Sequence, residues 1–293
     1  MRIAIYGRNY KKDFIPYINL IFSKLKEYNA RVLIYKPFYE FAISNGLKEQ
    51  NDISFFDGNE DFDAKVSFFI SIGGDGTFLE SVQFVRDENI PIIGINSGRL
   101  GFLANIAREE IDVSLTALFN GDFSLDERRL IKLEDTRNSS FGEFNYALNE
   151  VTIQKTDSAM ITINSYLNGE YLNAYWTDGL IISTPTGSTA YSLSVGGPIL
   201  TPDSCNFIIS PIASHNLTVR PIVVPDNYVL KLNVKSRNNK FLTTLDSRVR
   251  EFTGDTDLYL TLAKFTVKMI KIDTNSFYST IRNKLMWGID KRN

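Results

Sequence analysis

A glycine-rich run beside an apolar segment is the first place in the chain where residue types and spacing could do chemistry. It reads Gly73-Gly74-Asp75-Gly76-Thr77 and follows the apolar run at 66–72. Glycines let a backbone approach an anion closely and turn its N–H groups toward it, and a helix beginning here would offer its positive end to a phosphate. Asp75 could accept a proton from a hydroxyl group that is being phosphorylated. The alternative is a tight turn in which Asp75 only caps the helix.

A second candidate is a hydroxyl-rich stretch in the later half of the chain. It runs from Ser183 to Pro198 and follows Asp178 and an apolar segment at 180–182. Serine, threonine and backbone groups give short, directional hydrogen bonds without net charge, which suits a nucleotide pocket. The alternative is a connection in which these residues have ordinary turn and capping roles.

A third candidate is the pair Asn149-Glu150, at the start of a strand-like run at 151–153. A carboxylate can accept hydrogen bonds from both hydroxyls of a ribose, and an amide can pair with the edge of an adenine. Alone, such a pair is also common on ordinary protein surfaces.

The first of these candidates requires a parallel sheet to position it. Strand-like runs at 3–6, 31–35, 66–72 and 90–95 alternate with helical spacing at 14–28 and 77–86. Strands separated by helices predict a doubly wound α/β fold, in which ligands bind beyond the carboxyl ends of the strands. The glycine-rich run lies at such an end.

After residue 122 the pattern changes to short alternating segments, which predict an all-β, sandwich-like domain. Asn168-Gly169 lies between two apolar runs and indicates a hairpin with a type I′ turn. Helical spacing returns at 277–287. We therefore expect an α/β domain at 1–122, an all-β domain at 123–276, and a helical segment at 277–293 that packs back on the first domain.

Composition excludes several function classes. The 293 residues are 43% hydrophobic and 23% charged, with a net charge of −2 and no basic stripe, so a nucleic-acid partner is not expected. One cysteine (Cys205) and one histidine (His215) cannot build a usual zinc site, so a divalent metal would be held by oxygen atoms, which suits Mg²⁺. No signal peptide or membrane-spanning run is visible, and we expect a soluble cytoplasmic protein with no membrane partner.

Together these motifs resemble those of the NAD kinase family. The resemblance rests on the run 73–77, the pair 149–150, the run Thr184-Pro185-Thr186-Gly187-Ser188-Thr189-Ala190-Tyr191, and the run 96–103, which matches an Asn-x-Gly-x-x-Gly-Phe-Leu pattern. It extends through residues 211–221 and so spans nearly the whole chain. The glycine-rich run alone is shared with diacylglycerol, sphingosine and phosphofructo-kinases, whereas the conjunction is far more specific.

The resemblance implies a kinase that transfers a phosphoryl group from ATP or polyphosphate to the adenosine ribose 2′-hydroxyl of NAD, making NADP with Mg²⁺ and ATP. It implies an α/β and a β domain with the active site between them. It makes Asp75 the general base, with phosphate contacts from Gly73, Gly74, Gly76 and Thr77. Asn149 would meet the adenine and Glu150 a ribose diol, and the dinucleotide pocket would be lined by Thr186, Thr189, Ala190, Tyr191 and Ser194.

Two further implications concern assembly and a departure from the family pattern. Asp178 matches an aspartate that reaches into a neighbouring subunit's site, which implies a homodimer or homotetramer. At Asp246-Ser247-Arg248 many members have Asp-Gly-Gln, so the contacts of this loop are in doubt.

Other functions stay open at this point. A lipid or polyol kinase could share the glycine-rich run alone, although no basic amphipathic helix stands out. A non-catalytic nucleotide sensor is a third reading, against which only Asp75 argues. His215 could be an acid or base, but ordering a loop is the favoured interpretation.

Overall fold

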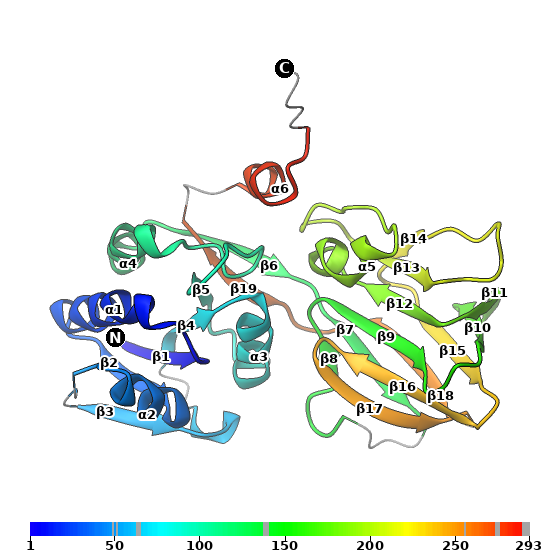
Figure 1. Cartoon of the computed structure of the whole chain (residues 1–293), viewed down its shortest axis with the longest axis horizontal. Helices are drawn as coiled ribbons and strands as arrows, with labels where there is room; N and C mark the ends of the chain where they lie inside the picture. Colours follow the sequence, from blue (N-terminus) through cyan, green and yellow to red (C-terminus); the bar gives the residue numbers. More distant parts are fainter. Residues whose placement is uncertain are drawn as a thin grey trace. The chain divides into compact units, whose positions relative to one another are not determined.

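The computed structural model describes residues 1–48, 50, 52–62, 66–136, 141–254, 256–272 and 276–288. The chain forms two compact units, one made of Met1–Glu127 with Val267–Asn293 and the other of Arg128–Thr266. Each unit has its own sheet system (Figure 1) and its own hydrophobic core. No helix among the described residues is long and apolar enough to cross a membrane.

The first unit is built on a seven-stranded sheet in the order β3-β2-β1-β4-β5-β19-β6. Strands β1 to β5 and β19 pair in parallel. The elements are β1 (Arg2–Gly7), α1 (Ile15–Glu27), β2 (Arg31–Tyr35), α2 (Lys36–Ser44), β3 (Ile53–Phe56), β4 (Val66–Gly73), α3 (Asp75–Val85), β5 (Ile92–Asn96), α4 (Ile111–Asn120), β6 (Ser124–Arg128), β19 (Val267–Lys271) and α6 (Phe277–Leu285), with 3-10 turns at Lys12–Phe14, Asn59–Asp61 and Arg108–Glu110.

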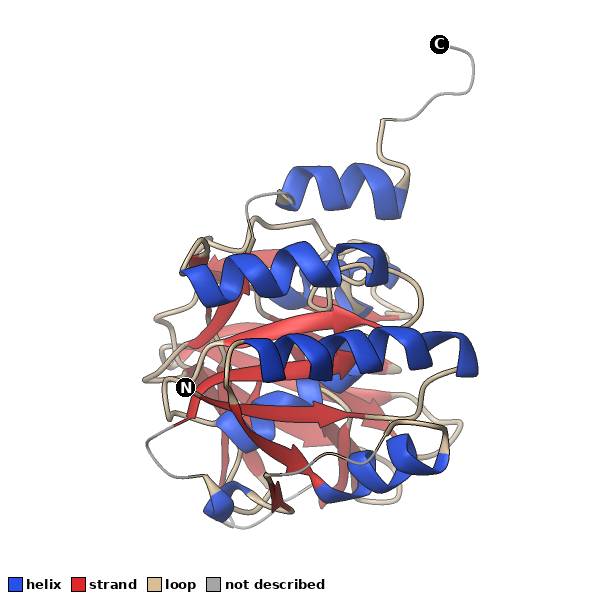
Figure 2. Cartoon of the chain, turned by 90° about the vertical axis from the view of Figure 1, so that its left-hand side faces the viewer, coloured by secondary structure: helices blue, strands red, loops and turns tan. Residues whose placement is uncertain are grey.

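Helices cover both faces of this sheet because successive strand side chains point to opposite faces. Ile70 and Ile72 of β4 lie in a core with α1, α2 and α4, and these helices lie in front of the strands in Figure 2. On the other face, Phe84 of α3 packs against Tyr6 with ring centroids 4.9 Å apart. The buried strands read as nearly continuous apolar runs for this reason.

The second unit is a sandwich of two six-stranded sheets, in the orders β11-β10-β15-β18-β7-β8 and β14-β13-β12-β9-β16-β17. Neighbouring strands are antiparallel throughout both sheets. The elements are β7 (Ile131–Asp135), β8 (Tyr146–Ala147), β9 (Glu150–Lys155), β10 (Ile161–Leu167), β11 (Glu170–Thr177), β12 (Gly179–Ser183), η4 (Thr186–Thr189), α5 (Tyr191–Ser194), β13 (Asn206–Ile212), β14 (Ile222–Pro225), β15 (Leu230–Lys235), β16 (Lys240–Leu245), β17 (Arg248–Thr253) and β18 (Asp257–Leu262).

The predicted fold class, a doubly wound α/β unit and an all-β sandwich, is confirmed. The compact units change over at 127/128 and 266/267, whereas the sequence pattern placed the changes at 122/123 and 276/277. The difference arises because β6 and β19 join the sheet of the α/β unit. Of the range 277–293, residues 289–293 lie outside the described part of the chain.

Candidate active site

The glycine-rich run lies where β4 ends and α3 begins, and each glycine has a different reason to be there. A Cβ on Gly73 would lie 2.2 Å from the hydroxyl oxygen of Thr77, so that position is closed to any side chain. A Cβ on Gly74 or Gly76 would meet nothing within 4 Å. The backbone at these two positions is therefore open to an approaching ligand, as phosphate binding at a helix N-terminus requires.

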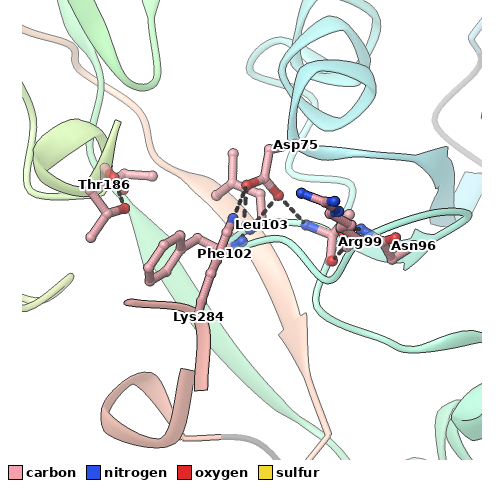
Figure 3. A network of polar contacts seen from close by, with 9 residues as sticks. Asp75, Asn96, Arg99, Phe102, Leu103, Thr186 and Lys284 are labelled. Carbon is pink, nitrogen blue, oxygen red and sulfur yellow. Dashed lines mark hydrogen bonds and ion pairs between the residues drawn. The ribbon is translucent and has the colours of Figure 1, made fainter. Parts of the chain in front are cut away.

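Asp75 is the first residue of α3, two residues earlier than the helix predicted from spacing. Its side chain does not cap its own helix but accepts hydrogen bonds from the backbone N–H groups of residues 102–104 (Figure 3). The donors are Phe102 to Oδ2 and Leu103 and Ala104 to Oδ1, each at 2.9 Å. The carboxylate therefore fixes the run 96–103, which sequence reasoning had singled out only as a motif.

The side chain of Asn96 holds the 96–103 run in a compact loop through hydrogen bonds to its backbone. The Asn96 side-chain amide donates to the carbonyl of Arg99 at 2.7 Å and to that of Ala104 at 3.3 Å, and its oxygen accepts from the N–H of Gly98 at 2.7 Å. A Cβ on Gly101 would lie 1.9 Å from Asp75 Oδ1. The loop can approach the carboxylate so closely only because residue 101 is a glycine.

An ion pair at the surface, joined by the hydroxyl of Tyr6, links α3 to the end of β1. Glu80 of α3 accepts a hydrogen bond from the hydroxyl of Tyr6 at 2.8 Å and two from Arg8, at 2.8 and 2.9 Å. The bidentate guanidinium contact is the geometrically most specific form of such a pair. Because it fixes the helix that starts at Asp75, it positions that carboxylate indirectly.

In the sandwich unit, Asn149 and Glu150 are buried at the start of β9, each 8% exposed. The β9–β12 pairing places Glu150 opposite Ser183, and the N–H of Thr184 donates to the Asn149 carbonyl at 2.9 Å. A Cβ on Gly187 would lie 2.2 Å from the same carbonyl oxygen. The structure thus brings together the second and third candidate motifs, which are more than thirty residues apart in the chain.

Two acceptor atoms of this pair, Asn149 Oδ1 and Glu150 Oε2, are buried without a hydrogen-bond partner among the described residues. Leaving a buried polar atom unsatisfied costs about 1–3 kcal/mol. Burial and the nearby charge of Asp246 raise the pKa of Glu150 to about 8, while a backbone hydrogen bond from Tyr191 acts in the opposite direction. The pair therefore offers two acceptor atoms whose hydrogen bonds the fold itself does not supply.

Asp246 holds the backbone of this pair in place. Its carboxylate accepts from the N–H groups of Leu148, Asn149 and Glu150 at 2.9, 2.8 and 3.2 Å, and its own N–H donates to the Glu150 carbonyl at 3.0 Å. Burial raises the pKa of Asp246. The doubt about this loop's contacts is thus resolved for the aspartate, which binds the Asn149-Glu150 segment.

The replacement at the third position of this loop has a separate structural role. The Arg248 guanidinium donates to the carbonyl oxygens of Phe144 and Tyr146 and lies over the Phe144 ring, 5.2 Å from its centroid. It therefore anchors the segment that leads into the Asn149-Glu150 pair. Nothing in the spacing of the sequence indicates this contact.

The hydroxyl-rich stretch contains two groups of residues, one buried and hydrogen-bonded within the fold and one partly or fully exposed to solvent. Thr184, Ser188 and Ser192 are fully buried and engaged within the fold, Thr184 with the Leu148 carbonyl at 2.6 Å, Ser188 with that of Pro185 at 2.6 Å, and Ser192 with the Ser210 hydroxyl at 3.2 Å. By contrast, the predicted pocket residues Thr189 and Ala190 are half-buried, and Tyr191 and Ser194 are exposed. These four residues are therefore at least partly open to solvent, in contrast to the three buried hydroxyls.

Thr186 differs from the rest of the predicted set because it is buried, 7% exposed. Its hydroxyl accepts from the guanidinium of Arg128 at 3.4 Å, and Arg128 itself is 8% exposed. A buried arginine beside this motif was not identified from the sequence, where it is one of two adjacent arginines with no distinguishing pattern.

Two other residues considered from the sequence have local partners. Asp178 accepts from the ammonium of Lys155 at 2.6 Å and its side chain is 34% exposed. The His215 ring packs against that of Trp176 at a tilt of 50°, with centroids 4.3 Å apart, and the His215 backbone N–H donates to the Trp176 carbonyl at 2.9 Å. The histidine therefore orders a loop against β11.

Comparison with known proteins agrees on one family. Models described as the ATP-NAD kinase N-terminal and C-terminal domains match residues 35–123 and 148–272. The curated NAD kinases of Flavobacterium johnsoniae and Bacteroides fragilis are 45% and 40% identical over 295 and 297 residues, each covering 100% of both chains.

Solved structures share the fold at low sequence identity. The yeast NADH kinase complexed with NADH superposes with a TM-score of 0.86 at 18% identity, over 99% of this chain and 88% of the other. The NAD kinase from Archaeoglobus fulgidus in complex with ATP has a TM-score of 0.73 at 22% identity, over 96% and 99%.

Proposed function

The chain belongs to the NAD kinase family, and we propose that it transfers the γ-phosphoryl group of ATP to the adenosine ribose 2′-hydroxyl of NAD. The observation that carries this proposal is the pair of unsatisfied buried acceptors, Asn149 Oδ1 and Glu150 Oε2. An adenosine offers the matching donors, an exocyclic amino group for the amide oxygen and a ribose hydroxyl for the unpaired carboxyl oxygen of Glu150. Asp246 holds both residues in register for that contact.

Asp75 would act as the general base of the transfer. It would take the proton of the 2′-hydroxyl as the oxygen attacks the phosphoryl group, and its position at the start of α3 places it beside open glycine backbone. Phosphoryl transfer needs little covalent chemistry from the protein, so positioning and electrostatics would supply most of the rate. The contacts from residues 102–104 keep the carboxylate in one orientation.

The phosphoryl donor would rest on the backbone N–H groups of Gly74 and Gly76, with Gly73 and Thr77 shaping the turn. Backbone amides do not distinguish a nucleotide triphosphate from a polyphosphate chain, so we include polyphosphate as a possible donor beside ATP. In the sandwich unit, Thr186, Thr189, Ala190, Tyr191 and Ser194 would line the dinucleotide pocket.

Mg²⁺ would enter with the phosphates of the donor. Among the residues that the structure describes, no group of three or more His, Cys, Asp or Glu side chains could hold a metal ion. The described residues therefore provide no preformed metal site made of protein ligands alone. Mg²⁺ commonly binds through substrate phosphates and water instead. No step proposed for Asp75 depends on a metal ligand from the protein.

We also propose a homodimer or homotetramer, in which Asp178 contacts the neighbouring subunit's site. Its partial exposure beside Lys155 leaves one face of the carboxylate accessible. Size-exclusion chromatography with light scattering would measure the assembly, and a monomer at micromolar concentration would contradict it. Cytoplasmic location and the absence of a nucleic-acid partner stay predictions from the sequence.

A coupled assay for NADP formation tests the proposed function. The purified protein is incubated with Mg-ATP or with polyphosphate, and with NAD, NADH or diacylglycerol as acceptor. We expect phosphate on NAD; phosphate on the lipid but not on NAD would establish the lipid-kinase alternative. Binding of NAD with no product from any donor after prolonged incubation would favour the sensor alternative.

A further inference from the structure

The Asp75 carboxylate has its acceptor positions filled by four donors. Three are the backbone N–H groups of residues 102–104, and the fourth is the ammonium of Lys284, 3.3 Å from Oδ2 (Figure 3). An ionised carboxylate offers about four lone-pair positions in all. A substrate hydroxyl can therefore reach this carboxylate only if one donor yields its place.

The three backbone donors are held in a closed loop. The Asn96 amide donates to the carbonyls of Arg99 and Ala104, and the N–H of Gly101 donates to the Ala104 carbonyl at 3.0 Å. Gly101 also lies against the carboxylate. Moving any of these N–H groups would disturb several hydrogen bonds together. These donors are therefore the fixed part of the arrangement.

Lys284 is the movable donor. It lies in the last turn of α6, and its ammonium ends a flexible four-carbon chain that is 34% exposed. The helix itself is anchored by Thr280 and Ile281, which are buried, so that Lys284 follows one turn after a fixed point. The ammonium also lies over the Phe102 ring, 4.5 Å from its centroid, which keeps it near the carboxylate when the ion pair opens.

We infer that Lys284 is a catalytic cation. Its ammonium leaves the Asp75 carboxylate and pairs with the phosphoryl group while that group is being transferred. The inference rests on the proposed function. As the 2′-hydroxyl loses its proton to Asp75, the oxygen's electron pair forms the new O–P bond, and the old P–O bond breaks with its electrons on the leaving phosphate. Asp75 becomes neutral at that moment, so Lys284 loses its counter-charge just as the transferred phosphoryl group arrives.

This exchange would favour the transition state over the bound substrates. Before transfer, the negative charge of Asp75 already compensates the positive charge of the Lys284 ammonium. During transfer Asp75 is neutral because it has taken the proton, so only the phosphoryl oxygens can compensate the ammonium. An interaction that strengthens toward the transition state accelerates the reaction rather than merely tightening substrate binding. After transfer, the same ammonium would pair with the 2′-phosphate of the product NADP.

The test compares neutral and cationic replacements at one position. Lys284→Met and Lys284→Gln remove the charge, Lys284→Arg keeps it, and Arg282→Met removes one exposed charge from the same helix as the matched control. For both neutral variants we expect kcat to fall roughly 10²-fold with little change in the KM for NAD. Lys284→Arg should stay within about tenfold of the wild type, and Arg282→Met should match it.

A binding measurement separates catalysis from a purely structural role. By calorimetry, Lys284→Met and Lys284→Gln should bind NADP roughly tenfold more weakly while NAD affinity is unchanged, because only NADP carries the 2′-phosphate. Equal loss of NAD and NADP affinity, or wild-type or faster turnover in both neutral variants, would overturn the inference while leaving the proposed function intact. Failure of the wild-type protein to make NADP would instead refute the proposed function, and the inference with it.

Discussion

The buried carboxyl group of Glu150 should make the stability of the sandwich unit depend on pH. Burial and the charge of Asp246 raise its pKa from 4.5 to about 8. Between these values the folded protein holds a proton that the unfolded chain has released, so stability falls as pH rises through this window and is highest below it. A difference of about 3.5 pKa units corresponds to roughly 5 kcal/mol, and the portion lost between pH 5.5 and 8 is roughly 3 kcal/mol.

Replacing Glu150 by glutamine should remove this dependence, since an amide of similar shape does not ionise. We expect the unfolding free energy of Glu150→Gln to exceed that of the wild type by an amount that grows from pH 5.5 to 9. Urea unfolding followed by Trp176 fluorescence would report the sandwich unit, provided that Trp287, the other tryptophan, is replaced by phenylalanine in every protein compared.

Glu251→Gln is the matched control for this experiment. Glu251 lies on β17 in the same sheet as Glu150, but it is half-exposed and paired with Lys240 at 2.8 Å. Its replacement should shift stability by less than about 1 kcal/mol, with no trend across this pH range. If the unfolding free energies of wild type and Glu150→Gln run parallel from pH 5.5 to 9, Glu150 is already ionised at neutral pH, and the argument from burial is wrong.

Three further outcomes are expected. Asp75→Asn should lower turnover roughly 10²–10⁴-fold with NAD affinity within a few-fold, measured by steady-state kinetics and calorimetry; full activity would contradict the general-base role. Gly101→Ala would place a methyl group 1.9 Å from Asp75 Oδ1. We expect a loss of activity comparable to that of Asp75→Asn, and about 1–3 kcal/mol of destabilisation in urea unfolding. Unchanged kinetics would refute the argument that residue 101 must be a glycine for Asp75 to be positioned. Asp246→Ala leaves three backbone N–H donors without their acceptor. The free energy of unfolding should fall by about 3 kcal/mol, and NAD binding measured by calorimetry should weaken at least roughly tenfold. Wild-type NAD affinity would show that Asn149 and Glu150 do not need Asp246 to hold them.

The parts of the fold that were predictable carry local signals. β4 could be identified because a strand buried on both faces reads as a continuous apolar run, and its end because glycines follow. The hairpin at Asn168-Gly169 has the required backbone, with φ of 49° and 86° at the two positions. In each case neighbouring residues alone determine the local structure.

Elements without such signals were missed. α2 begins directly after β2 with no polar break, and Pro37 near its start was its only local indication. β3 has two exposed positions out of four, so its sequence shows no clean alternation of buried and exposed residues. β6 and β19 both fall within the predicted all-β range 123–276. β19 shows the short alternation typical of sandwich strands, β6 has a single apolar residue, and the sheet partners of both lie far away in sequence.

The candidate site divides in the same way. Residue type and spacing identify Asp75 and the Asn149-Glu150 pair as candidates, but not the groups that hold them. The three amides at 102–104, the carboxylate of Asp246 and the ammonium of Lys284 are brought to their partners by tertiary structure, across 27 to 209 positions of sequence. No local pattern encodes such contacts.

The position of β19 between β5 and β6 has a consequence for how the chain is made. During translation the ribosome delivers β5 and β6 first, then the whole sandwich unit, and only afterwards the strand that joins them. At roughly 5–20 residues per second, this delay is on the order of ten seconds. Throughout it the nascent α/β layer carries an open gap in its sheet, so the sandwich can fold first and the layer bearing Asp75 is completed last. Chaperones that shield unpaired strand edges should therefore engage this polypeptide before its final segment emerges.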